Sequence, residues 1–353
     1  MTGRKQYTQI GSYTSTVKAV GYGVPQGSVL GPLLFVLYVN DIMRAIKTCK
    51  FLMYADDLVF YTSNNKVPLE AQRLQSDIDN VALWCKDKRL TVNTDKTKTV
   101  WFGSGKKLPR LILPDFVMDG RKLECVKEYT YLGLRLDCHL TMELAMKDLS
   151  QKVNNRLFRF TKLRHLLTNN ASILVYKTMI MTVFDYCSFA YAGCTDTTLL
   201  KMQRLQNRGL RTCYRYNREH LSIIEMHNES GVPYLKRRRE ELLLTLMYKH
   251  SRKPDYVDLR RGERVTRSEN KIKFLVKQPK LAGYKKSPLY RGAHLWNLLG
   301  DWYHHTECKQ LFKTRIQRLD NIEIVNENPD DSDSFVDDES IMYSDSDSGS
   351  EGV

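Results

Sequence analysis

The tightest constraint on this chain is a pair of adjacent aspartates set between two short apolar runs. Asp56 and Asp57 follow the run Phe51–Ala55 and precede the run Leu58–Tyr61. Two runs of β-forming residues joined by a turn-forming pair predict an antiparallel hairpin with both carboxylates at its tip. Adjacent carboxylates repel each other, and a hard divalent cation shared with substrate phosphates relieves that repulsion. The pair therefore indicates either metal-assisted phosphoryl transfer or an Asp-Asp turn that only completes the hydrogen bonds of the hairpin.

The charge of the chain points to a polyanionic partner. There are 55 Lys and Arg residues against 40 Asp and Glu, a formal net charge of +15. From residue 327 onward there are ten acidic residues and no Lys or Arg, so residues 1–326 hold +25. Such a field predicts nucleic acid or an anionic membrane surface as the partner. Membrane insertion is not expected, because the longest apolar run, residues 29–39, has 11 residues, against the ~20 that a spanning helix needs.

The N-terminus and the cysteines indicate an intracellular protein, nuclear or cytoplasmic. The first residues contain no apolar leader, and none of the 8 cysteines forms a C-x-x-C pair. In a chain of this kind the cysteines are expected to be reduced thiols. Cys187, Cys194, Cys213 and His220 form a loose group, but its spacing fits no usual zinc module, and buried thiols are the preferred interpretation.

The pattern of apolar residues divides the chain into an α+β part and an all-α part. Up to residue 138 it predicts a hairpin at 7–24, then a turn at 25–28 in which Ser28 caps the next helix, and a buried helix at 29–47. The hairpin around the aspartates follows, then a helix from Pro68 and strands at 99–103 and 129–136. Beyond residue 138 it predicts helices at 149–167, from 170 or 172 to 186, from a cap at Asp196 to 216, and at 235–250, with a basic region at 250–290. The predicted domains are 1–138, 139–326 and an acidic tail at 327–353 that is expected to be disordered.

Several strings of the α+β part occur together in one known family. Gly-Val-Pro-Gln-Gly-Ser-Val-Leu-Gly-Pro-Leu-Leu-Phe at 23–35, Asn-Asp-Ile at 40–42 and Tyr-Ala-Asp-Asp at 54–57 closely resemble the reverse transcriptase domain of non-LTR (LINE-type) retrotransposons. Leu-Thr-Val-Asn at 90–93, Lys-Thr at 96–97 and Tyr-Leu-Gly at 131–133 keep the order of that family. Residues 176–191 and 205–208 are similar to its helical thumb and connection. The resemblance covers residues 12–215 in detail.

This resemblance implies an α+β polymerase palm, present in part, followed by an all-α thumb and C-terminal region. It implies an RNA-directed DNA polymerase that extends a DNA primer on an RNA template with dNTPs and Mg²⁺, or with Mn²⁺ in its place. The catalytic and metal-binding residues would be Asp56 and Asp57. The substrate-binding residues would be Pro25, Gln26, Gly27, Tyr54 and Lys96, and the residues at the primer would be Leu132 and Gly133. The other interpretation of Gln26 is a solvent-facing turn residue, and that of Lys96 is a solvated loop lysine.

The chain also departs from the family's pattern. Polymerases of this class need a third carboxylate, on a strand several dozen residues before the first string. Only 22 residues precede Gly23, and they contain no Asp or Glu. We therefore expect an N-terminally truncated palm that is inactive as this chain. The alternatives are a catalytically dead nucleic-acid-binding remnant, a host-adopted fragment, or an interaction protein whose acidic tail recruits a basic partner or folds back on the chain's own basic face.

Three further groups of residues carry expectations. A basic stripe at steps of 3, 4, 3 and 4 would contact nucleic-acid phosphates or form a solvated helix face; it consists of Lys201, Arg204, Arg208, Arg211 and Arg215. The run 236–239 is interpreted as the first turn of an exposed helix rather than a nuclear-localisation patch, because Glu240 and Glu241 follow it. Trp296 and Trp302 are interpreted as core anchors rather than platforms for base stacking.

Overall fold

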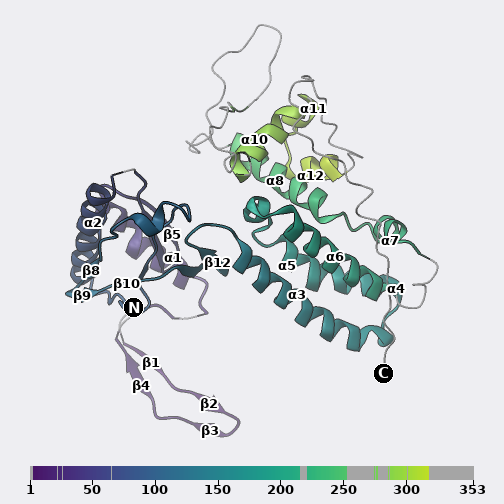
Figure 1. Ribbon diagram of the computed structural model, residues 1–353. Helices are drawn as coiled ribbons and strands as arrows, with labels where there is room; N and C mark the ends of the chain where they lie inside the picture. Colours follow the sequence, from purple (N-terminus) through teal and green to yellow (C-terminus); the bar gives the residue numbers. More distant parts are fainter. Residues whose placement is uncertain are drawn as a thin grey trace, which may run out of the picture. The chain divides into compact units, whose positions relative to one another are not determined.

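The chain has mixed helix and strand structure, as predicted, and folds as two compact units that divide between Ala145 and Met146 (Figure 1). The sequence pattern had suggested a boundary at residue 138. The computed structural model describes residues 3–21, 23–25, 27–64, 66–214, 221–252, 274, 276, 285, 287–299 and 301–317, with the side chains of 192, 193, 301 and 302 excepted. The two units are described separately below.

Unit 1 consists of hairpins around one long helix. Its helical segments are α1 (Gly31–Val39), a 3₁₀ turn (Asn40–Arg44), α2 (Val67–Asp87) and a second 3₁₀ turn (Leu108–Arg110). Its strands are β1 (Arg4–Gln6), β2 (Gln9–Ile10), β3 (Tyr13–Thr14), β4 (Lys18–Val20), β5 (Lys50–Tyr54), β6 (Asp57–Tyr61), β7 (Lys98–Thr99), β8 (Val117–Met118), β9 (Arg121–Lys122), β10 (Glu124–Cys125), β11 (Glu128–Tyr131) and β12 (Leu134–Asp137).

Every sheet found in the described part of unit 1 has two strands. The pairs β1–β4, β2–β3, β5–β6, β8–β9 and β11–β12 are antiparallel, and β7–β10 is parallel. The hairpin predicted at 7–24 begins at Arg4 and ends at Val20, and it forms the ribbon that extends from unit 1 in Figure 1. The strand predicted at 99–103 is shorter, because only Lys98 and Thr99 pair with β10.

The core of unit 1 forms where α2 packs against the β5–β6 hairpin. Apolar residues of α2 recur at helical spacing, as predicted, and Ile78, Val81 and Cys85 are buried in this core with Phe116. On the hairpin, Phe51 and Met53 alternate with exposed neighbours and turn toward the same core. The core therefore fixes which face of the hairpin is turned inward, and it leaves the tip in solvent.

The helix predicted to be buried at 29–47 differs from the expectation. It is the nine-residue α1 followed by a 3₁₀ turn, and Leu33 and Leu37 are 55% and 64% exposed. The reason is that buried positions require a packed partner on every side, and α1 is apolar all round but is in contact with protein on one side only. Val39 and the following Ile42 are buried, while the opposite side of α1 faces water. The sequence pattern correctly identified a helix here, but its predicted burial was wrong.

Unit 2 is helical in its described residues. Its first part consists of α3 (Glu143–Leu163), a 3₁₀ turn (Arg164–Leu166), α4 (Asn169–Val175), a π-helical turn (Tyr176–Met181), α5 (Thr182–Asp185), a 3₁₀ segment (Ser188–Gly193) and α6 (Asp196–Cys213). Its second part consists of α7 (Ile223–Ser230), α8 (Leu235–Ser251), α10 (Pro288–Leu298), α11 (Asp301–His304) and α12 (Lys309–Gln317). Asp196 was predicted to cap α6, but it is the first helical residue. Thr195 is the N-cap, because its hydroxyl accepts a hydrogen bond from the amide of Thr198.

A close approach of helices holds the first part of unit 2 together. Gly209 of α6 lies against Tyr176, so close that an added Cβ would sit 2.5 Å from the tyrosine ring. At the end of α6, the fully buried Arg164 donates from Nε to the carbonyls of Thr212 (3.0 Å) and Cys213 (3.1 Å). These carbonyls end a helix and have no intrahelical partner, so the guanidinium satisfies groups that would otherwise be buried unpaired. The orientation of α6 is thereby fixed from two directions.

A second core in unit 2 is built on α8, α10 and α12. Four side chains are fully buried within it: Leu244, Met247, Trp296 and Phe312. The Trp296 ring is tilted against the Phe312 ring, with centroids 5.7 Å apart. The interpretation of Trp296 as a core anchor is therefore confirmed. The side chain of Trp302 lies outside the described residues.

Other sequence-based expectations also fall on residues that are not described. They concern Gln26, Arg215, the end of the third predicted helix at 216, His220, most of the basic region 250–290 and the acidic tail 327–353. Within the described ranges, no helix combines the length and the apolar character that crossing a bilayer requires.

Candidate functional site

The tip of the β5–β6 hairpin carries the two aspartates. The register pairs Tyr54 with Asp57, so the two-residue turn consists of Ala55 and Asp56, and Asp57 begins β6. The turn thus lies one residue earlier than the predicted Asp56–Asp57 turn. Ala55 has φ of +53°, because short hairpin loops with left-handed residues match the twist of the paired strands. For a residue with a Cβ this conformation costs about 1–2 kcal/mol, and such strain concentrates at functional sites.

The hairpin is anchored at its base by a buried carboxylate. Asp77 of α2 accepts hydrogen bonds from the backbone N–H of Lys47 (3.0 Å), Thr48 (2.9 Å) and Cys49 (2.7 Å), and from the Thr48 hydroxyl (2.8 Å). Burial alone would raise the pKa of Asp77, but these donors outweigh burial and lower the pKa to about 2. The three residues lead directly into β5. Asp77 therefore fixes the point from which the hairpin extends toward its tip.

Asp56 and Asp57 are two adjacent carboxylates of the kind that a hard divalent cation binds. Both residues are exposed, and hard cations such as Mg²⁺ bind through one or two carboxylates together with substrate phosphates. Among the described residues, no cluster of three or more His, Cys, Asp or Glu could hold a metal ion. Asp41, the other acidic residue of the family-like strings, instead forms an ion pair with Lys88 at 2.9 Å.

The loop before α1 has the geometry of an open backbone surface. The Ser28 hydroxyl donates to the Pro25 carbonyl (2.8 Å) and accepts the Gly31 amide (3.0 Å), so Ser28 braces the loop, while α1 itself begins at Gly31 with Leu30 at the N-cap position. Gly27 has φ of +79° and no atom within 4 Å of the place where a Cβ would be. The backbone at Gly27 is therefore accessible to a bound molecule. Lys96, predicted to assist at the nucleotide, is exposed on the loop after α2, where its amide bonds Asn93.

The second hairpin tip is formed by Leu132 and Gly133. Tyr131 pairs with Leu134, and both turn residues have positive φ, +46° for Leu132 and +76° for Gly133. This is the pattern of a type I′ turn, which normally has Asn or Gly at its first position. Both hairpin tips that the sequence identifies as functional thus place a non-glycine residue in the left-handed region.

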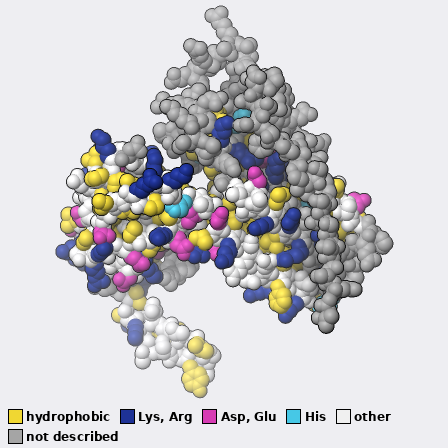
Figure 2. Space-filling model, in the orientation of Figure 1, with side chains coloured by type: hydrophobic (Ala, Val, Ile, Leu, Met, Phe, Trp, Pro, Cys, Tyr) yellow, Lys and Arg dark blue, Asp and Glu magenta, His cyan; other side chains and the backbone are white. Residues whose placement is uncertain are grey.

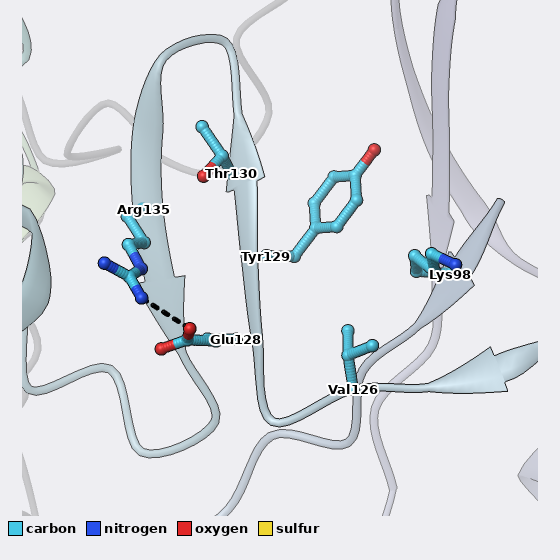
Figure 3. Close-up of a pocket in the computed structure, with 6 residues that line it drawn as sticks. All are labelled: Lys98, Val126, Glu128, Tyr129, Thr130 and Arg135. Atoms are coloured by element: carbon cyan, nitrogen blue, oxygen red, sulfur yellow. Dashed lines mark hydrogen bonds and ion pairs between the residues drawn. The ribbon is translucent and has the colours of Figure 1, made fainter. Parts of the chain in front are cut away.

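A pocket of about 190 Å³ lies at the base of the β11–β12 hairpin (Figure 3). Figure 3 shows the Tyr129 ring projecting from β11 toward Lys98 of β7. Arg135 pairs with Glu128 at 2.5 Å, and Lys98 pairs with Glu124 at 2.5 Å. Because both cations already have a carboxylate partner, the pocket has little net charge to offer a phosphate.

The basic stripe of α6 lies on the outer face of that helix. Met202, Leu205, Leu210 and Cys213 are buried on the inner face, as the helical spacing predicts. Lys201, Arg204 and Arg208 are exposed on the opposite face, and Arg211 is half-buried beside them. Arg208 donates to Asn154 of the neighbouring α3. Figure 2 shows Lys and Arg side chains dispersed over the face of the molecule that it draws, among hydrophobic and uncharged ones.

The arginines at the start of α8 are more enclosed than predicted. The sequence suggested the first turn of an exposed helix, and the residues do form that turn. Arg238, however, makes a two-point ion pair with Asp185, with distances of 2.9 and 2.8 Å, and also contacts the buried Glu241. Through these contacts Arg238 joins α8 to α5. The expectation of an exposed helix face was therefore wrong at this position.

Sequence reasoning missed two parts of the site. It did not identify Asp77, because a single acidic residue within an amphipathic helix resembles any solvated position. The signal is its place on the core side of α2, between the partly buried Leu74 and the buried Ile78 and Val81. It also missed the left-handed residues Ala55 and Leu132, since neither residue type indicates positive φ by itself.

Comparison with known proteins identifies similar sequences over much of the chain. Residues 4–136 match the family described as reverse transcriptase (RNA-dependent DNA polymerase). The chain is 25% identical over 218 residues to the RNA-directed DNA polymerase from mobile element jockey of Drosophila melanogaster, which covers 59% of this chain and 23% of that protein. It is 27% identical over 219 residues to the corresponding jockey protein of Drosophila funebris, covering 59% and 24%.

A third relative is the probable RNA-directed DNA polymerase from transposon BS of Drosophila melanogaster. It is 28% identical over 218 residues, covering 59% of this chain and 24% of the relative. The matched segment is thus about a quarter of the length of these relatives. No solved structure matches the chain significantly.

Proposed function

Because residues 4–136 match the reverse transcriptase family and the chain is similar to RNA-directed DNA polymerases of mobile elements, we propose that it is a template–primer-binding part of such a polymerase from a non-LTR retrotransposon. The observation that carries the proposal is the β5–β6 tip inside the matched segment. It presents Asp56 and Asp57 to solvent on a strained two-residue turn, held at its base by Asp77. In this proposal unit 1 is a partial polymerase palm and unit 2 is the thumb and C-terminal region.

Asp56 and Asp57 are the residues that would hold Mg²⁺, or Mn²⁺ in its place. A divalent cation bound there would supply charge neutralisation for the dNTP phosphates and for the attacking primer oxygen. The chain's own contribution is position. Pro25 and Gly27 leave an open backbone surface for the nucleotide, and Lys96 adds a cation on an exposed loop. The Leu132–Gly133 turn would contact the primer strand.

The exposed face of α6 is the proposed contact for the nucleic-acid backbone. Its cations repel one another at steps of three and four residues, which costs free energy unless an anion is bound. A rigid helix with four cations on one face, in a chain whose residues 1–326 hold +25, suits a phosphate backbone without sequence preference.

Binding is tested with an RNA template annealed to a labelled DNA primer, by fluorescence anisotropy at several salt concentrations. The variant Arg204→Gln/Arg208→Gln is expected to bind roughly tenfold or more weakly and to reduce the slope of log K against log salt by about 1–2. The matched control, Lys152→Gln/Arg159→Gln, removes the same charge from exposed positions that helical spacing places on the opposite side of α3 from Asn154, the contact of Arg208. Equal weakening by both variants would show that only net charge matters and would remove the α6 face from the proposal.

A second candidate function is nucleic-acid binding without catalysis. It is favoured by the finding that, within the described ranges, no third acidic side chain joins Asp56 and Asp57 in a metal-binding cluster. Primer extension on poly(rA)/oligo(dT) with Mg²⁺ separates the two functions. We expect no incorporation beyond that of Asp56→Ala. Robust incorporation that the Asp56→Ala variant loses would establish catalysis by this chain and reject the binding-only function.

A further inference from the structure

The C-terminal helices of unit 2 bring two chain segments together at one corner. The Tyr248 ring of α8 stacks on Phe312 of α12 with centroids 4.5 Å apart. The Tyr248 hydroxyl donates to the carbonyls of Thr306 (2.9 Å) and Glu307 (2.7 Å), just before α12 begins. Both rings are buried. The last turn of α8 is therefore fixed beside the first turn of α12.

This packing places three lysines close together. Lys249 follows Tyr248, Lys313 follows Phe312, and Lys309 precedes Lys313 by one helical turn on the same side of α12. Lys249 and Lys309 are exposed, and Lys313 is half-buried. Repulsion from Lys249 is the main reason that the pKa of Lys309 is lowered, and Lys313 adds to the effect. The ammonium groups are thus near enough to destabilise one another.

No carboxylate compensates these charges in the part of the chain that the structure describes. None of the ion pairs found there includes Lys249, Lys309 or Lys313. Two further cations are nearby, because Arg252 donates to the Thr306 carbonyl and Arg315 donates to the Thr306 hydroxyl at 2.6 Å. The segment 305–308 between α11 and α12 holds one acidic residue, Glu307. An excess of cations at a well-packed corner creates a positive potential that attracts an external anion.

We propose that Lys249, Lys309 and Lys313 form a phosphate-binding site for the backbone of a nucleic acid, distinct from the α6 face. Three ammonium groups are point-charge donors that hold phosphate oxygens without demanding one orientation. The aromatic rings at this corner, Tyr248 and Phe312, are buried in the core and cannot stack on bases. The site therefore contacts backbone and not sequence. The proposal rests on the proposed function, and it adds a second contact on a different pair of helices.

The first test is protection of the lysines from acylation. The full chain is treated with an N-hydroxysuccinimide ester, with and without the RNA template–DNA primer duplex, and modified lysines are identified by mass spectrometry. We expect the duplex to protect Lys249, Lys309 and Lys313 severalfold and to leave Lys152 on α3 unchanged. Equal acylation of the three lysines in both samples would overturn the proposal.

The second test is the variant Lys249→Gln/Lys309→Gln, measured by anisotropy on the same duplex. Loss of two cations is expected to weaken binding about tenfold at 0.1 M salt and to reduce the salt slope by about 1–2. Both positions are exposed, so circular dichroism melting should match the unchanged chain. The control Lys152→Gln/Arg159→Gln removes equal charge elsewhere on unit 2.

The outcomes separate this inference from the proposed function. If the α6 variant weakens binding and the Lys249→Gln/Lys309→Gln variant does not, the lysine site is rejected and the proposed function stands. If the duplex does not bind the unchanged chain at all, the proposed function fails as well. A zero-length carboxyl–amine cross-linker that joins Lys249 or Lys309 to residues 327–353, equally with and without duplex, would assign the site to an acidic peptide and overturn the proposal.

Discussion

Replacing Asp77 by Asn should destabilise unit 1 in a pH-dependent way. The carboxylate accepts three backbone amides and one hydroxyl, at 2.7–3.0 Å. An Asn side chain offers one carbonyl oxygen and turns an amide donor toward the remaining N–H groups. Loss of such charged hydrogen bonds at a buried position typically costs about 2–4 kcal/mol.

The magnitude follows from the pKa of Asp77. It falls from the ordinary 3.8 to about 2 in the folded protein. A folded-state pKa below the unfolded one stabilises the protein above pH ~4, and the stabilisation is lost as the pH falls from ~4 to ~2. The shift corresponds to roughly 2.5 kcal/mol in full, of which about 1 kcal/mol is lost between pH 5 and pH 3.

The assay is urea unfolding read by peroxide oxidation of Met118, which is 4% exposed in the core of unit 1. Peroxide oxidises methionine at both pH 5 and pH 3. Because Met118 lies in unit 1, its oxidation reports the unfolding of unit 1 and not that of unit 2. The difference in unfolding free energy between the unchanged chain and Asp77→Asn should shrink by about 1 kcal/mol from pH 5 to pH 3. Asp79→Asn, an exposed aspartate two residues along α2, is the control and should show no such difference. A pH-independent difference for Asp77→Asn would refute the argument that its ionised form carries the stabilisation.

Two further predictions concern unit 2. Gly209→Ala should lower the unfolding free energy by about 1–3 kcal/mol, because its Cβ would meet the Tyr176 ring. Gly292→Ala should cost less, because its Cβ would meet the flexible Met247 thioether, at 2.7 Å. Equal shifts of the urea midpoint for the two variants would contradict this prediction. Iodoacetamide should alkylate Cys308 faster than the buried cysteines. The pH midpoint of its alkylation rate, measured between pH 6 and 9, should lie below the ~8.5 of an ordinary thiol, because the amides of Leu311 and Gln310 lower the pKa of Cys308. A midpoint at or above that value would show that these amides do not stabilise the thiolate.

Local sequence patterns predicted the helices and strands of the chain better than the contacts that these elements make. The alternation in β5 and β6 indicated the hairpin, but its turn lies one residue earlier than expected because Tyr54 pairs with Asp57. The steps of three and four residues identified α3, α6 and α8, whose buried faces repeat at that spacing. Such signals are contained in neighbouring residues, so they survive without knowledge of the tertiary fold.

The failures concern contacts between distant residues. Arg238 looked like an exposed first-turn arginine, and its pairing with Asp185 depends on a residue 53 positions away. Asp77 binds amides that precede it by about thirty positions. The predicted burial of α1 was wrong for the same reason. An apolar sequence shows that a helix has a surface suited to burial, but burial also needs a packing partner, which can be distant in the sequence. The paired aspartates were identifiable because their chemistry depends on adjacency alone.

The exposed side of α1 makes the isolated chain prone to association. Leu33, Val36 and Leu37 are exposed and share one face of α1 at helical spacing. Exposed apolar surfaces of this kind favour association with a further protein, whether a partner, a chaperone or a second copy of the chain. The purified chain is therefore expected to self-associate unless a partner or a polar fusion covers that helix.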